Sequence, residues 1–146
     1  MPEKETKERA EQDKREGKAP STQAGEFVHE EIEHVREGKH GARSTKQAIA
    51  IGLAKARRAG VKLPAKKGTS QKTQEQAARD IRKGKSAAKT KKSAKRSRAT
   101  SRALKREGSS AASKASLSRQ ARSAAAKRSA ASRSRSAKKA ARTRKK

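Results

Sequence analysis

The sequence predicts a mostly disordered chain that contains one small all-α module. Hydrophobic residues make up only 29% of the 146 positions, aromatic residues make up 1%, and the formal net charge is +29. A chain with so little apolar surface and so much charge cannot bury enough area to offset the entropy of ordering. The exception is residues 44–64, S-T-K-Q-A-I-A-I-G-L-A-K-A-R-R-A-G-V-K-L-P, where signals for a helix start, an apolar face and a helix stop coincide.

Residues 1–24 are predicted to be a charged flexible arm. Acidic and basic side chains alternate along it, and pairs such as Glu3 and Lys7 have the i, i+4 spacing that supports a solvated helix. The arm shows no apolar stripe that would dock it on another element, and Pro20 interrupts it. We therefore expect fluctuating helix here, with binding of a protein partner by the arm as the alternative.

The helical module is expected over residues 25–64, and its first helix at about 25–37. A broad apolar face of this helix is shared by Phe27, Val28, Ile32 and Val35. Phe27 is the only aromatic residue in the chain, so we expect it to fill the core rather than to stack on a base. A glycine at position 38 can end the helix.

The second helix of the module is expected at about 45–59. Ser44 can act as its N-cap, and Gln47 can complete a capping box by accepting from the N–H of that cap. Gly60 stands where a left-handed C-cap would lie, and Pro64 prevents continuation. Three residues at i, i+4 and i+7 spacing form the predicted apolar face: Ile49, Leu53 and Ala56.

The linker at 38–43 is short, which favours an antiparallel helical hairpin. The first helix is acidic and the second is basic, so their faces complement each other. The hairpin has few large apolar residues for its length, and we therefore expect it to gain stability through a homo-oligomer or a ligand.

Beyond the hairpin, residues 65–84 are predicted to be a basic linker. The pattern there is compatible with a third short helix at about 74–83, with Thr73 and Gln76 as its capping box. Residues 85–146 form a low-complexity tail of Lys, Arg, Ser and Ala. Repulsion between like charges should keep this tail disordered in water, although its residues are good helix formers that neutralisation by phosphates would favour.

The sequence offers no signal for an enzyme. Cysteine is absent, which excludes a thiol nucleophile and a zinc-finger framework. The segment H-E-E-I-E-H resembles a zinc-binding helix, but His29 and His34 are five residues apart and do not share a helix face. Together with His40 they could offer only an accidental weak site. We expect no metal, no cofactor and no small-molecule substrate.

The distribution of charge along the chain predicts which class of molecule it binds. Residues 64–146 carry 29 Lys and Arg against 3 Asp and Glu, whereas residues 1–63 carry 14 against 11. Such an excess points to nucleic acid, drawn by long-range attraction and counterion release. DNA is favoured over RNA, and the lack of aromatic residues and of a recognition scaffold predicts contact with phosphates rather than with bases.

The candidate nucleic-acid-binding residues are Arg43, Lys46, Lys55, Arg57, Arg58, Lys62, Lys66, Lys67, Lys91, Lys92, Lys95, Arg96, Arg98, Arg102, Lys105, Arg106, Lys127, Arg128, Arg133, Arg135, Lys138, Lys139, Arg142 and Arg144. Two alternatives remain open: a protein-interaction adaptor or antitoxin-like module whose basic tail only localises it, and an RNA-binding protein. No signal peptide or membrane span is apparent, so we expect a cytoplasmic, nucleoid-associated protein.

The stretch S-T-K-Q-A-I-A-I-G-L-A-K-A-R-R-A-G-V-K-L-P resembles a family of small basic bacterial proteins that share a K-Q-A-I-A-I-G-L-x-x-A-R-x-A-G core. The family is largely a domain of unknown function, and some members are labelled plasmid stabilisation or DNA-binding proteins. The resemblance covers roughly residues 25–65 and implies no catalytic residues. The tail is separately similar in composition to linker-histone C-terminal domains and to bacterial histone-like tails.

Overall fold

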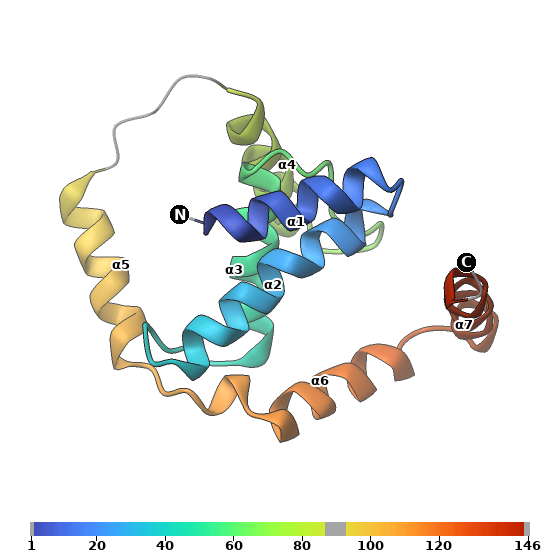
Figure 1. Cartoon of the computed structure of the whole chain (residues 1–146). Helices are drawn as coiled ribbons and strands as arrows, with labels where there is room; N and C mark the ends of the chain where they lie inside the picture. The colour runs from blue at the N-terminus through green and yellow to red at the C-terminus, as the bar shows by residue number, and fades with distance from the viewer. Residues whose placement is uncertain (1, 87–92, 145–146) are drawn as a thin grey trace.

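The computed structural model describes residues 2–86 and 93–144, and within them it has seven α-helices and one short 3-10 helix. Figure 1 shows four helices packed together, which we call the bundle: α1 (Lys4–Arg15), α2 (Pro20–Arg36), α3 (Thr45–Arg58) and α4 (Gln71–Lys85). The other elements curve around the bundle, and we call residues 93–144 the basic arm: α5 (Ala94–Arg106), η1 (Ser110–Ala112), α6 (Lys114–Ala126) and α7 (Ala130–Arg144).

The expectation of a mostly disordered chain with a low-complexity, unstructured tail is therefore wrong. The tail was expected to stay extended because its charges repel, but its composition also favours helix. Ala, Arg and Lys have high helix propensity, and no proline follows Pro64. Serine hydroxyls at the helix starts supply the N-caps: those of Ser93 and Ser113 accept hydrogen bonds from the backbone N–H groups of Arg96 and Ser116.

The pair of helices expected at about 25–37 and 45–59 is present as α2 and α3, and the two pack against each other. The buried face of α3 shares only Ala56 with the expected one. It consists of four small residues, Thr45, Ala48, Gly52 and Ala56, whereas Ile49 is only half-buried. Small side chains let the two backbones approach closely, so that a Cβ atom at Gly52 would lie 2.7 Å from the Cα of Val28.

The helix ends agree with the sequence in part. Ser44 caps α3, since its Oγ accepts from the N–H of Gln47 at 3.2 Å. The Gln47 side chain, however, accepts from the N–H of Arg43 at 2.8 Å rather than from that of Ser44. Helix α4 begins at Gln71, and its cap is Ser70, three residues before the predicted cap at Thr73.

Helix α1 packs on α2, although no apolar stripe was apparent in residues 1–24. Its buried positions are Thr6, Ala10 and Asp13, which are spaced at i, i+4 and i+7. Ala10 joins a core cluster with Ala24, Phe27, Ala56 and Val61, against which Leu53 and Leu63 also pack. The side chain of Phe27 is 1% exposed, which confirms that it fills the core.

Helix α4 packs on α3 through Ala77 and Asp80, which are both buried. The Asp80 carboxylate receives a hydrogen bond of 2.8 Å from Nε of Arg58. The short helix expected at about 74–83 is thus longer, and an ion pair between α3 and α4 fixes it to the bundle.

The basic arm joins the bundle at the α2–α3 loop, residues 37–44. Ala111 and Ala112 of η1 are buried in a second core cluster with Ile32, Val35, Ala42 and Ala48. The Thr45 hydroxyl donates to the Ala111 carbonyl at 2.6 Å, and Nε of Arg36 donates to the Ala112 carbonyl at 3.1 Å. The arm is therefore docked through backbone carbonyls and two small apolar side chains.

A second set of contacts fixes the C-terminal end of α5. The N–H of Gly41 donates to the Leu104 carbonyl at 2.9 Å, and the N–H of Ala42 donates to the Gly108 carbonyl at 3.2 Å. A Cβ atom at Gly41 would collide with the backbone carbonyl of Glu107. The loop between α2 and α3 accordingly has two roles, since it closes the helical pair and holds the arm.

Candidate nucleic-acid interface

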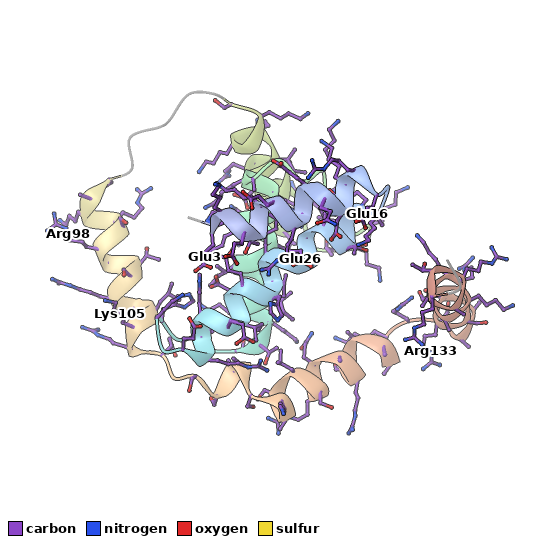
Figure 2. The ribbon with its side chains drawn as sticks, viewed as in Figure 1. Glu3, Glu16, Glu26, Arg98, Lys105 and Arg133 are labelled. Carbon is purple, nitrogen blue, oxygen red and sulfur yellow. The ribbon has the colours of Figure 1, made fainter. Side chains whose placement is uncertain are left out.

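Acidic and basic side chains lie on different parts of the molecule. Figure 2 shows Glu3, Glu16 and Glu26 on the bundle, and Arg98, Lys105 and Arg133 on the arm. Glu107 is the only acidic residue between positions 93 and 144. Within the part of the chain that the structure describes, every ion pair has both partners at or before Asp80, so the cations of the arm have no carboxylate partner.

Helix α5 presents a row of cations. Lys95, Arg98, Arg102 and Lys105 recur at spacings of three and four residues, so they lie along one face of the helix. All four side chains are exposed, and α5 contains no buried residue. Such a row is suited to a line of phosphates.

Helix α7 has the same character. Arg135, Lys138 and Arg142 share one face, and α7 likewise has neither an acidic nor a buried residue. Just before α7, the Arg128 side chain is half-buried. It donates to the Ser132 carbonyl at 3.1 Å and to the Ser136 hydroxyl. This arginine therefore fixes the turn between α6 and α7.

Three of the predicted cations form ion pairs or hydrogen bonds with other residues of the bundle. Nζ of Lys55 lies 2.6 Å from a carboxylate oxygen of the buried Glu31. Nε of Arg57 donates to the Leu63 carbonyl at 2.7 Å, and Arg58 pairs with Asp80. We therefore leave these three out of the interface that we infer below.

The remaining predicted residues fall into two groups. Lys91 and Lys92 lie outside the described residues. The others are exposed: Arg43, Lys46, Lys62, Lys66, Lys67, Lys95, Arg96, Arg98, Arg102, Lys105, Arg106, Lys127, Arg133, Arg135, Lys138, Lys139, Arg142 and Arg144.

A polar groove connects the bundle to the arm. The groove is lined by Arg43, Ser44 and Lys46 at the start of α3 and by Ser116 and Arg119 of α6. The start of a helix carries a partial positive charge, which adds to that of the three cations. The groove is therefore a place where a phosphate could meet both parts of the molecule.

Sequence reasoning missed the cations of α6, namely Lys114, Arg119 and Arg122. They are exposed, and Arg119 lies beside Arg43 and Lys46 only because the arm docks on the α2–α3 loop. Their positive charge was visible in the sequence, but their position next to α3 was not.

Fold and site together define a small all-α protein with a bundle and a cationic helical arm. Residues 17–67 match a family of unknown function, DUF6496. The matched segment contains α2, α3 and the loop between them, and the arm lies outside it. The resemblance to a family of unknown function is thus confirmed over this segment, whereas the plasmid-stabilisation label and the histone-like tail stay predictions.

No curated protein and no solved structure matches the chain. Among the helices that the structure describes, none is long and apolar enough to cross a membrane.

Proposed function

We propose that the chain binds DNA without sequence preference, and that the exposed faces of α5, α6 and α7 are the contact surface. The observation that supports this most is the lack of carboxylate partners for the cations of the arm. An exposed cation without a partner gains most from a phosphate, because binding releases the counterions that DNA holds. The bundle acts as a scaffold that carries these helices.

Because the arm is docked on the bundle, its cations are held in fixed positions before DNA is bound. Thr45 and Gly41 hold the arm at two points, on either side of Gly108. Part of the entropy cost of ordering the arm is then met when the protein folds, which raises its affinity for DNA. Helix α5, with 13 residues, is about 20 Å long, and the major groove of B-DNA admits a helix of this width.

The arm offers little for reading bases. Asparagine is absent from the chain, and its only aromatic side chain is buried in the bundle. Arg and Lys that point in many directions neutralise phosphates of any sequence. We therefore expect similar affinities for duplexes of different sequence.

A triple variant of α5 tests the proposal: Arg98→Gln, Arg102→Gln and Lys105→Gln in the full chain. Glutamine has nearly the helix propensity of the residues that it replaces, so the helix should remain. Affinity for a duplex of about 30 base pairs should fall more than tenfold at low salt, and the slope of log K against log salt should lose about three units.

The matched control removes the same charge from the bundle by Lys14→Gln, Arg15→Gln and Lys72→Gln, three exposed positions. This control should bind nearly as the native chain does. If the two triple variants weaken DNA binding equally, net charge alone accounts for the affinity. The arm is then not the contact surface. A structured RNA that competes better than duplex DNA at matched salt would favour the RNA-binding alternative.

A further inference from the structure

We propose that Glu31, His34 and His40 form a binding site for a divalent transition metal ion, with Zn²⁺ as the probe. One nitrogen of each imidazole and one carboxylate oxygen of Glu31 lie within 4.8 Å of one another. Ligand atoms around a tetrahedral Zn²⁺ are about 3.3 Å apart, as zinc–ligand distances of about 2.0 Å require. The pair of Nε2 of His40 and Oε1 of Glu31 is already at 3.2 Å.

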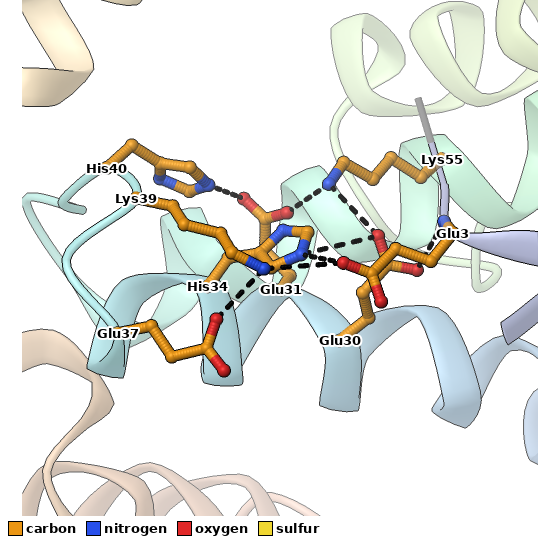
Figure 3. A network of polar contacts seen from close by, with 8 residues as sticks. All are labelled: Glu3, Glu30, Glu31, His34, Glu37, Lys39, His40 and Lys55. Atoms are coloured by element: carbon orange, nitrogen blue, oxygen red, sulfur yellow. Dashed lines mark hydrogen bonds and ion pairs between the residues drawn. The ribbon is translucent and has the colours of Figure 1, made fainter. Parts of the chain in front are cut away.

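The turn after α2 brings these residues together. Glu31 and His34 lie one turn apart on α2, and the chain then reverses at Gly38, which has a φ of +72°. His40 returns to the same side of the helix, and Figure 3 shows its ring facing the Glu31 carboxylate. The fold thus places His40 near His34 as the second imidazole ligand, a position that His29 cannot take because of its spacing from His34.

Hydrogen bonds orient both imidazole rings for a ligand. Nδ1 of His40 lies 3.0 Å from the Gly41 carbonyl and can only donate to it, so Nε2, which faces Glu31, is the nitrogen that can offer a lone pair to a metal ion. Nε2 of His34 lies 3.1 Å from the Glu3 carboxylate and can donate to it, so Nδ1 is the nitrogen that can offer a lone pair to a metal ion. Metal-binding histidines are held in this way, with the second nitrogen donating to a carbonyl or a carboxylate.

The buried charges around Glu31 are not balanced. Glu31 and its neighbour Glu30 are both buried, and the cation of the bundle that reaches them is Lys55, at 2.6 Å and 3.7 Å. One buried negative charge is thus in excess when the histidines are neutral, and buried charges need partners.

The oxygens of Glu31 also lack hydrogen bonds. The Glu31 side chain is fully buried, and within the described residues neither oxygen has a hydrogen-bond partner. Lys55 approaches Oε2 as an ion pair, which leaves Oε1 facing Nε2 of His40. A metal ion between these two atoms would bind the lone pairs of both and neutralise Glu31.

The donor set selects the kind of ion. Two imidazoles and one carboxylate are the three protein ligands of many zinc sites that keep a fourth position open. Imidazole nitrogen favours Zn²⁺ and its neighbours in the first transition row over Ca²⁺ and Mg²⁺, which take oxygen ligands. The formal charge of +29 should also discourage stray binding of cations elsewhere.

The test uses the full chain after dialysis against a chelator, with Zn²⁺ alone as the probe. Titration calorimetry should show one ion per chain. His34→Gln and His40→Gln should each weaken binding at least tenfold, which corresponds to about 1.4 kcal/mol. His29→Gln is the matched control, because His29 is exposed on α2 outside the cluster, and it should bind as the native chain does.

A second measurement does not depend on whether the variants fold. In the native chain, Zn²⁺ should shift the imidazole nitrogen resonances of His34 and His40 and leave those of His29 in place. The proposal is overturned if Zn²⁺ produces neither heat nor shifts, in which case protons neutralise Glu31. It is overturned equally if His29 shifts with the other two, because the ion is then adventitious.

Discussion

At the scale of single residues, serine hydroxyls mark where helices begin. The side chains of Ser44, Ser70, Ser93 and Ser113 cap α3, α4, α5 and α6, and the Ser129 hydroxyl accepts from the N–H of Ser132 at the start of α7. Each cap satisfies a backbone N–H that has no partner inside its own helix. In a tail where serine is frequent, the capping serines cannot be told from the others by composition.

Replacing one cap tests this account. Ser113→Ala should destabilise the start of α6 by about 1 kcal/mol, because the N–H of Ser116 loses its acceptor. Ser118→Ala, in the exposed middle of the same helix, should be neutral or slightly stabilising. Amide hydrogen exchange of α6 measures both. Equal exchange in the two variants would show that the Ser113 hydroxyl does not act as a cap.

A charged group at the end of α1 gives a pH-dependent effect. The pKa of Glu16 is lowered from its usual value of 4.5, because Lys18 and Gln12 donate hydrogen bonds to its carboxylate. A lowered pKa in the folded state means that Glu16 stabilises the fold above pH 4.5. This contribution is lost as the pH falls through the folded value.

The midpoint of the Glu16 carboxyl resonance in an NMR titration should therefore lie below 4.5. In Lys18→Gln the midpoint should move back toward that value, because the ammonium of Lys18 is the main cause of the shift. A midpoint that is the same in the native chain and in the variant would contradict the ion pair seen at 2.7 Å.

At the scale of elements, the contact between α2 and α3 depends on a small residue. Gly52→Ala should destabilise the protein by about 1–3 kcal/mol, because the new methyl group meets the backbone of Val28 and Phe27. Gly25→Ala on α2 has no atom within 4 Å and should instead stabilise by up to about 1 kcal/mol. Chemical denaturation distinguishes these opposite signs. A stabilised Gly52→Ala would mean that the helices are farther apart.

The elements also show what the sequence could predict. Caps, apolar residues and stop signals coincide at 44–64, and this region predicted α3. The apolar spacing at about 25–37 predicted most of α2, although that helix begins earlier, at Pro20. The predicted buried face of α3 was right at Ala56 but missed Thr45, Ala48 and Gly52, because the search favoured large apolar side chains. In a chain with few of them, the core is built from Ala, Gly and Thr, as at Ala48 and Ala56.

The packing of α1 and the helices of the basic arm were missed for a related reason. Ala10 docks α1, and Ala111 and Ala112 dock the arm, yet alanine is common throughout both segments and gives no distinctive pattern. Repulsion between the cations was given more weight than helix propensity and capping. The cations themselves were predictable, since most of them lie exposed on the arm, but the pairing of Lys55 with Glu31 depends on the contact of α2 with α3.

At the scale of the whole molecule, two alanines join the arm to the bundle. Ala112→Gln should release the arm, because Ala112 is fully buried and has no room for a polar side chain. Ala115→Gln, at an exposed position of α6, should leave it docked. Small-angle scattering should show a larger radius of gyration for the first variant only. An unchanged radius in Ala112→Gln would contradict the docking.

The molecule is divided into a bundle that carries both acidic and basic residues and an arm whose charged residues, apart from Glu107, are all cations. This division underlies the function that we propose. Self-association through the hairpin stays a prediction. Nearly every exposed cation of the arm is free for a phosphate, and an arm of this charge that engages about six to ten phosphates should bind with a strong dependence on salt.

The most direct test measures the binding of the full chain to duplex DNA as a function of salt. If the arm neutralises that many phosphates, the association constant should fall by about 10³–10⁵ between about 50 and 200 mM salt, in a straight line on logarithmic axes. An association constant that hardly changes over this range, or no binding at the lower salt, would contradict the account.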